Sequence, residues 1–227
     1  MFKYATIILT AACGLQAGII TIISQGTTPG TWSQGLQGPG AFTTYADVGW
    51  TTGATPYSNV TIQALLRGDD VVNTVDAYLT TAIGTGTTTA NEVARTLGIS
   101  VASGSFNQVT LFTGLNLAAS TSYFLTLAPG GSTHLTWGID DSQPSPVTAS
   151  GVSIIPAGWC NMDGFDCASY PPASGPLTLS GGVPVNPLGA NPIFSVVAND
   201  SSVPEPASAA LLAGGLGLVI LARRRRR

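Results

Sequence analysis

The chain has 227 residues, of which only 8% are charged, and it is rich in glycine and proline, with 28 and 15 residues. This length suggests one main domain. Between residues 24 and 202 two arginines stand against ten acidic residues, a formal charge of −8. Such a surface repels phosphate backbones, which argues against nucleic-acid binding, and the lysine-free, Thr/Ser/Gly-rich body is typical of a secreted β-rich protein.

A secretory signal peptide is predicted at residues 1–25, where Lys3 precedes an uncharged apolar run at residues 5–23. Such a helix directs Sec export and is removed by signal peptidase. Cleavage fits either the bond after Ala17 or the neighbourhood of Gly26, and the pattern does not choose between them. A non-cleaved signal anchor is the alternative, and Cys13 is a weak candidate for a lipoprotein cysteine.

The next part of the chain predicts short strands separated by turns. Residues 26–40 hold much Gly, Gln, Thr and Pro, and we expect a flexible leading segment there. Runs of β-branched and aromatic residues predict strands at residues 60–65 and 74–80. Residues 91–97 suggest a short helix or an irregular turn, and residues 99–101 another short strand.

The clearest strands lie between residues 106 and 138, around a turn predicted at Pro129-Gly130-Gly131. Residues 193–197 predict the last strand. The pattern indicates an all-β fold, a β-sandwich (jelly-roll-like) ectodomain at residues 26–198, because short strands with regular turn signals favour two packed antiparallel sheets. The apolar residues expected in or near the core are Val109, Leu111, Leu115, Leu117, Tyr123, Leu125, Leu127, Leu135 and Trp137.

The two cysteines that remain after signal removal, Cys160 and Cys167, predict a disulfide, because an even count in an exported protein favours pairing. Closing this ring would restrict the unfolded chain by about 2.5 kcal/mol. Two free thiols are the alternative. The loop around them carries aromatic rings beside carboxylates, which suits sugar stacking and hydroxyl binding, although a purely structural clasp is the favoured reading. These possible ligand-binding residues are Trp159, Asp163, Phe165, Asp166 and Tyr170.

Catalytic and metal signals are few, and we predict no catalytic residue, no metal site and no cofactor. His134 is the sole histidine, so a Ser-His-Asp arrangement would have to use it as the base, and no Gly-x-Ser-x-Gly elbow accompanies it. One histidine and two close cysteines do not suit zinc. The pairs Asp69-Asp70 and Asp140-Asp141 could contribute to a calcium site, but solvated turn acids are favoured. Arg67-Gly68-Asp69 spells an adhesion tripeptide that also recurs by chance.

The C-terminus has three parts in a fixed order, after a polar linker at residues 199–203. A proline-braced motif, Val203-Pro204-Glu205-Pro206, is expected to be extended. An uncharged run of 16 residues, 207–222, would form a transmembrane helix of about 24 Å, short for a hydrocarbon core of about 30 Å. The chain then ends in a cytoplasmic cationic stop, made of Arg223, Arg224, Arg225, Arg226 and Arg227.

These three parts, at residues 204–227 and the valine before them, resemble the PEP-CTERM sorting signal of Gram-negative bacteria. The resemblance implies processing by exosortase, a membrane cysteine transpeptidase, transient anchoring in the inner membrane, and display at the cell surface or in the extracellular matrix. It also implies an association with exopolysaccharide or biofilm. The stretch at residues 106–127 resembles the β-sandwich ectodomains of such proteins.

The sequence therefore predicts a non-enzymatic exported protein that is sorted by its tail. The alternative is a secreted carbohydrate-binding module, which requires a ligand face on the folded sandwich. A secreted hydrolase is a third hypothesis, which requires converging acids or His134 beside a hydroxyl nucleophile.

Overall fold

The computed structural model describes residues 18–29, 33–37, 44–83, 88–131, 133–140, 145–161 and 191–200. Besides one 3₁₀ turn, η1 (Thr89–Asn91), the regular elements of these residues are strands. The strands are β1 (Gly18–Gln25), β2 (Ser33–Gln37), β3 (Thr44–Thr51), β4 (Tyr57–Gly68), β5 (Thr74–Thr80), β6 (Glu92–Ser100), β7 (Asn107–Leu117), β8 (Ser122–Pro129), β9 (His134–Asp140), β10 (Val147–Thr148), β11 (Ser153–Asn161), β12 (Asn191–Pro192) and β13 (Phe194–Asp200). The prediction of an all-β fold is confirmed.

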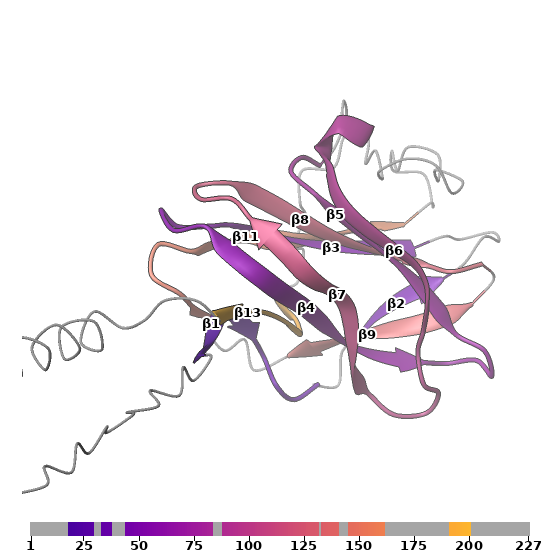
Figure 1. Ribbon diagram of the computed structural model, residues 1–227. Coiled ribbons are helices and arrows are strands. Elements are labelled where there is room, and N and C mark those ends of the chain that lie inside the picture. Colours follow the sequence, from indigo (N-terminus) through magenta and orange to yellow (C-terminus); the bar gives the residue numbers. More distant parts are fainter. Residues whose placement is uncertain are drawn as a thin grey trace, which may run out of the picture. The chain divides into compact units, whose positions relative to one another are not determined.

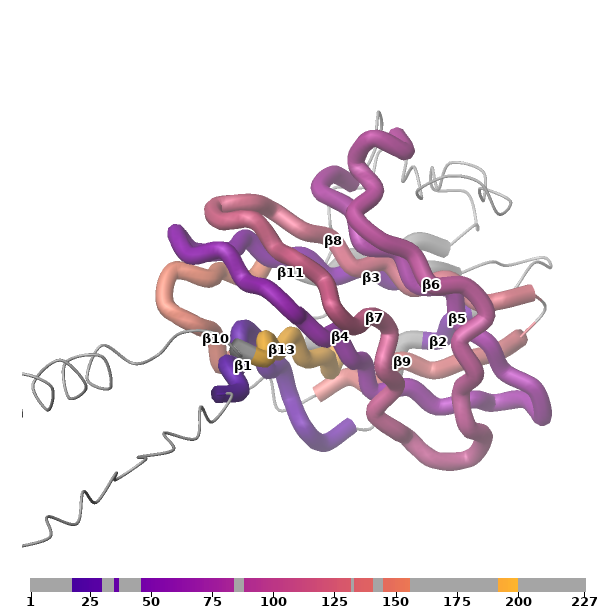
Figure 2. The backbone as a smooth tube through the Cα atoms, in the orientation of Figure 1, coloured from indigo at the N-terminus to yellow at the C-terminus, as the bar shows by residue number. Residues whose placement is uncertain are grey.

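The strands form two antiparallel layers, which Figures 1 and 2 show one above the other. One layer has the order β10-β1-β13-β4-β7, and the other has the order β11-β3-β8-β5-β6. Strands β9 and β2 continue the hydrogen bonding from the end of β4 to the start of β3. The two layers thus face each other as in a sandwich and are joined along one side.

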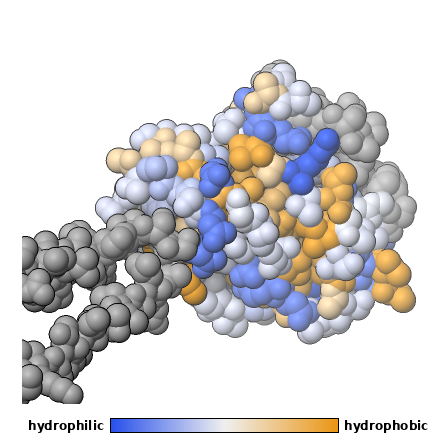
Figure 3. Space-filling view, viewed as in Figure 1, coloured by the Kyte–Doolittle hydropathy of each residue, from blue (hydrophilic) through white to orange (hydrophobic). Residues whose placement is uncertain are grey.

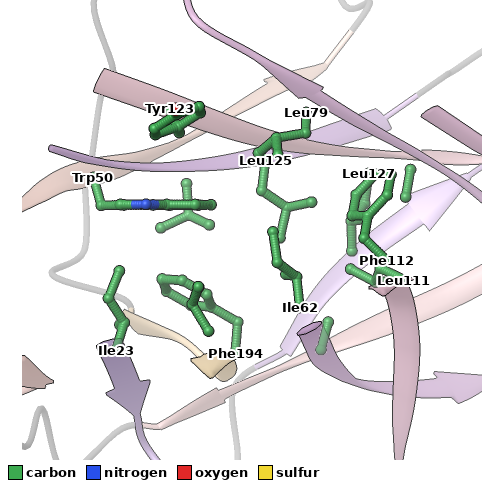
Figure 4. Packing of buried hydrophobic residues seen from close by; sticks show 14 of the residues in the cluster. Ile23, Trp50, Ile62, Leu79, Leu111, Phe112, Tyr123, Leu125, Leu127 and Phe194 are labelled. Atoms are coloured by element: carbon green, nitrogen blue, oxygen red, sulfur yellow. The ribbon is translucent and has the colours of Figure 1, made fainter. Parts of the chain in front are cut away.

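The core lies between the layers and is built from both (Figure 4). Trp50 of β3 stacks on Tyr123 of β8, and its other neighbour is Phe194 of β13, with 6.0 Å between ring centroids in each pair. Seven of the residues expected in the core are buried: Leu111, Leu117, Tyr123, Leu125, Leu127, Leu135 and Trp137. The other two, Val109 and Leu115, are partly buried and pack against the same cluster.

The alternation of side chains along a strand explains why several strands could be predicted from the sequence. The predicted strand at residues 74–80 has the bounds of β5, and residues 123–127 and 134–138 fall inside β8 and β9. The predicted turn follows β8, and Gly131 there has φ +70°, which a side chain would disfavour. Within the stretch of clearest strands, residues 107–117 form one strand, β7, in which Gly114 also has a positive φ.

The expectation of a helix or irregular turn at residues 91–97 was wrong, because these residues form most of β6. The exposure of successive side chains along β6 alternates, as in a strand, and β6 pairs with β5. The Oδ1 atom of Asp76 on β5 accepts the backbone N–H of Gly98 at 2.7 Å, at a bulge where Gly98 has φ +66°. Ala94 and Leu97 favour a helix by their intrinsic propensity, but the hydrogen bonds that β6 makes with β5 outweigh this preference.

The leading segment expected at residues 26–40 is not wholly irregular, because β2 lies within it and pairs with β9. Strand β1 begins earlier still, inside the apolar run assigned to the signal peptide. It lies between β10 and β13, and the side chains of Ile22 and Ile23 are fully buried. Part of that apolar run is therefore core sequence in this fold.

Candidate functional site

Most of the functional residues predicted at the two ends of the chain and in the cysteine loop lie outside the described residues. This holds for the tail from Val203 to Arg227 and for Cys167. Within the described part of the chain, no helix is long and apolar enough to span a membrane. The expected disulfide and membrane helix therefore stay predictions.

Only the start of the loop proposed to bind sugar lies within the described residues. Trp159 and Cys160 belong to the backbone of β11, opposite Ala46 and Tyr45 of β3. The other four residues of the loop, Asp163, Phe165, Asp166 and Tyr170, lie outside the described residues.

A different set of residues forms an open hollow of about 740 Å³ at the far end of β4. We call it the β4–β5 hollow, because most of its lining comes from the end of β4 and the loop that leads to β5. The loop between β6 and β7 closes its other side. Its lining residues are Arg67, Gly68, Asp69, Asp70, Val71, Ser103 and Gly104.

The β4–β5 loop takes its shape from Asn73, whose side chain is 3% exposed. Its Oδ1 accepts the backbone N–H of Asp70 at 2.9 Å, and its Nδ2 donates to the backbone carbonyl of Asp70 at 2.6 Å. A Cβ at Gly68 would lie 2.2 Å from this Nδ2 atom, so only glycine leaves room for the amide. The loop is thus held from within by one buried side chain.

The loop between β6 and β7 is fixed to the same structure. The N–H of Gly68 donates to the carbonyl of Ala102 at 2.9 Å, and the N–H of Gly104 donates to the carbonyl of Gly68 at 3.1 Å. The Ser103 hydroxyl donates to the carbonyl of Asp70 and accepts from Asn73. Backbone and side-chain bonds therefore join two loops that are about thirty residues apart in the sequence.

Arg67 and Asp69 form the first charged pair of the hollow, with Nε and Oδ1 2.9 Å apart. The other carboxylate oxygen of Asp69 accepts the Thr136 hydroxyl of β9, and the guanidinium of Arg67 lies 5.0 Å above the ring of Phe106. Both charged side chains are about one third exposed, so the pair itself adds little stability. Its contribution is to orient the arginine.

Asp70 and His134 form the second interacting pair. The Oδ2 atom of Asp70 accepts the backbone N–H of His134 at 2.8 Å and lies 2.9 Å from its ring Nδ1. The backbone hydrogen bond from His134, followed by the bond to its ring, lowers the pKa of Asp70 from its usual 3.8. His134 is the first residue of β9, and half of its side chain is exposed.

This arrangement does not form a nucleophile–histidine–acid relay among the described residues. A relay needs the hydroxyl on one ring nitrogen and the carboxylate on the other. Here the Ser103 hydroxyl donates to the carbonyl of Asp70, and the ring of His134 contacts Asp70 through Nδ1. Among the described residues, no three His, Cys, Asp or Glu side chains lie close enough to hold a metal ion.

The sequence had marked Arg67, Asp69, Asp70 and His134, but as unrelated features, and the fold brings them together. The adhesion tripeptide does not present its two charges separately, because Arg67 is paired with Asp69. Ser103, Val71 and Asn73 were missed. The only local signal was an asparagine a few residues after the strand-ending Gly68, and nothing local relates it to residues 103 or 134.

A second hollow, of about 370 Å³, opens between β6 and β7, on the face where Figure 3 shows apolar residues gathered. Arg95 is the one ionisable residue in its lining, which is otherwise Ala, Thr, Leu and Phe. Its lining has one charged residue where that of the β4–β5 hollow has three, and it is the weaker candidate.

The comparisons with known proteins concern the tail above all. Residues 202–227 match the family model of the PEP-CTERM protein-sorting motif. This confirms the resemblance that the three-part tail suggested. The match ends with the sequence given and leaves the folded body outside it. No curated protein matches the chain.

Distant structural likenesses of the chain include structures of infectious bursal disease virus. The Gt strain structure has 13% identity and a TM-score of 0.31, over 82% of this chain and 37% of that one. The VP2 subviral particle has 12% identity and a TM-score of 0.30, and the Gx strain 14% and 0.30, each over 93% of this chain and 50% of the other. The chain spans half or less of the length of these chains.

Proposed function

We propose that this chain, which carries a PEP-CTERM protein-sorting motif at residues 202–227, is a non-enzymatic protein of the cell surface or extracellular matrix of a Gram-negative bacterium. The motif implies export and sorting through an exosortase-type membrane transpeptidase. Signal peptidase, the Sec pathway and the inner membrane are the other partners in this route. The mature protein associates with exopolysaccharide.

The observation that carries the proposal is the position of the motif directly after the folded body. The last strand, β13, ends at Asp200, and the motif match begins at residue 202. The processing enzyme thus meets an extended peptide, Pro204-Glu205-Pro206, only a few residues from the domain. The two prolines restrict the unbound peptide, which lowers the entropy lost on entering a protease cleft.

In the proposal, the rest of the tail anchors the peptide in the membrane and sets its orientation. The run at residues 207–222 holds the peptide at the bilayer, although about 24 Å of helix spans the hydrocarbon core only with local thinning or snorkelling. The arginines from Arg223 onward stay in the cytoplasm and set the orientation. A short, poorly matched span suits an anchor that is held only until processing.

The non-enzymatic role rests on the arrangement around the sole histidine. The His134 ring contacts Asp70, and the nearby Ser103 hydroxyl donates to a carbonyl, so neither supports the other as base and nucleophile. A hydrolase would lose its activity on a test polysaccharide when His134 is replaced by Gln. Release of reducing ends by the wild-type protein, abolished in His134→Gln, would refute the non-enzymatic role.

The sorting assignment is tested by mass spectrometry of both mature termini, from membrane and medium fractions. Wild-type protein is expected without its tail, and a Glu205→Ala, Pro206→Ala variant is expected to stay full length in the membrane. A Glu92→Ala variant, which changes one acidic residue of the body, is the control and is processed normally. Normal processing of the tail variant would contradict the assignment.

The finer predictions are part of the same proposal. They are a jelly-roll-like connection, a Cys160–Cys167 disulfide, and sugar contacts from the loop of Trp159, Asp163, Phe165, Asp166 and Tyr170. The disulfide predicts a mass two hydrogens below that of the reduced protein. The sugar-binding alternative has a more specific basis in the β4–β5 hollow, which is developed next.

A further inference from the structure

We propose that the β4–β5 hollow is a binding site for a neutral, hydroxyl-rich polysaccharide chain. This inference rests on the proposed function, since it names the part of the matrix that the exported body would bind. It uses residues on three segments: the loop after β4, the loop after β6, and the start of β9.

The first argument is the concentration of functional groups. In residues 18–200 the basic side chains are Arg67, Arg95 and His134, and two of these three lie at this one hollow or its rim. They meet the adjacent carboxylates of Asp69 and Asp70. Oriented hydrogen-bonding side chains therefore gather at this hollow.

The second argument is that donors and acceptors remain available side by side. The described contacts use two of the five N–H donors of Arg67, through Nε and one terminal nitrogen. Asp70 receives both His134 bonds on Oδ2, and among the described residues its Oδ1 accepts none. Arg67 and Asp70 both line the hollow, so a ligand there meets a donor and an acceptor together.

This combination selects the chemical class of the ligand. A hydroxyl group both donates and accepts, so it satisfies Arg67 and Asp70 at once, whereas an ammonium group can only donate. A polyanion is disfavoured because Arg67, Asp69 and Asp70 sum to −1 with His134 neutral, in a body that is acidic throughout. A neutral sugar chain has hydroxyl groups that both donate and accept, and it carries no charge that the acidic body would repel.

The third argument is shape and rigidity. The hollow is open to solvent, which suits a polymer that runs across it rather than an enclosed small molecule. Val71 forms an apolar wall and is 96% exposed, and Val72 beside it is 71% exposed. Val71 provides contact for the C–H faces of a sugar. The bonds of Asn73 and Ser103 hold the loop in place, so little entropy is lost on binding.

The test is affinity electrophoresis of the mature protein in native gels. The gels contain dextran, a soluble β-glucan, a galactomannan, or the polyuronate alginate. Wild-type protein is expected to be retarded by at least one neutral polymer and not by alginate. Arg67→Gln is expected to weaken binding about ten-fold, since a hydrogen bond from a charged group is lost. Val71→Ser is expected to weaken it about three-fold.

Each variant has a matched control. Arg95→Gln removes the other arginine of the body, which pairs with Glu92 on β6. Val147→Ser changes a valine of β10 that is 63% exposed. Both controls are expected to bind as wild type. Val71→Ser also guards against misfolding, because an exposed side chain at a loop tip can be changed without loss of the core, and thermal unfolding of each variant checks this.

Three results would overturn the proposal: no retardation in any neutral polymer, stronger retardation in alginate, or equal binding by the site variants and their controls. Its failure is distinguishable from failure of the proposed function. If the termini show normal export and tail removal but the site variants bind normally, only the hollow is excluded. If the tail is retained but neutral polymers retard the protein through Arg67, only the sorting route is excluded.

Discussion

The ring of Phe194, on the last strand, lies 6.0 Å from the indole of Trp50, on a strand of the opposite layer. Both side chains are buried, at 1% and 0% exposure. Figure 4 shows Trp50 between Phe194 and Tyr123, so this stack spans the core from one layer to the other. The strand that ends just before the sorting motif is therefore also a strand that holds the two layers together.

Phe194→Ala is expected to destabilise the protein by about 3–5 kcal/mol, because it leaves a cavity against Trp50. Chemical denaturation followed by tryptophan fluorescence measures the loss. Val197→Ala, on the same strand but only half-buried, is the control and is expected to cost clearly less. Equal losses for the two variants would show that the stack is not a main contact between the layers.

The mature N-terminus is expected at Gly18, after cleavage behind Ala17. Strand β1 starts at Gly18, and the side chains of Ile22 and Ile23 are fully buried. Cleavage near Gly26 would remove both isoleucines from the core, at about 2–5 kcal/mol for each, which is comparable to the whole stability of a domain.

Mass spectrometry of the mature protein checks this position. A protein that starts at residue 26 or later and still unfolds cooperatively would contradict it. Ala17→Arg provides a second check, since a large charged residue before the bond should block cleavage and leave the full leader attached. Gly26→Ala should not change the cleavage position.

Gly68→Ala is expected to destabilise the β4–β5 loop by about 1–3 kcal/mol. The new Cβ would overlap the buried amide of Asn73, whose Nδ2 would be 2.2 Å away, and the amide would lose its bonds to Asp70 and Ser103. Hydrogen exchange of the loop amides measures the effect. Gly35→Ala serves as control, since nothing lies within 4 Å of a Cβ there. Unchanged protection in Gly68→Ala would refute this account of the loop.

The bond between Asp70 and His134 is expected to weaken in acid. Folding lowers the pKa of Asp70 below its usual 3.8, so the folded state favours the ionised carboxylate. The stabilisation is therefore complete above the unfolded pKa and is lost as the pH falls through the lower, folded pKa. The Tm difference between wild type and Asp70→Asn should be constant near pH 5 and shrink towards about pH 2. A difference that grows in acid would contradict this sign.

A structural feature could be predicted from the sequence when the residues that determine it lie within one short stretch. The alternation of Tyr123, Leu125 and Leu127 predicted β8 because side chains on successive residues of a strand point to opposite faces. The turn at residues 129–131 was readable from its own composition. The β6 residues were misread because the partner that makes them a strand is β5, and pairing between strands leaves no mark on local composition.

By itself the sequence determined the all-β class, much of the core and the sorting motif, because strand periodicity, turn composition and the order of proline motif, apolar run and arginines are each contained in one short stretch. Only the tertiary structure decided that β1 is core and that Arg67, Asp70, Ser103 and His134 meet at one hollow. Those relationships depend on which strands pair and in which register. Register is selected by burial of the whole core, which no single stretch of sequence contains.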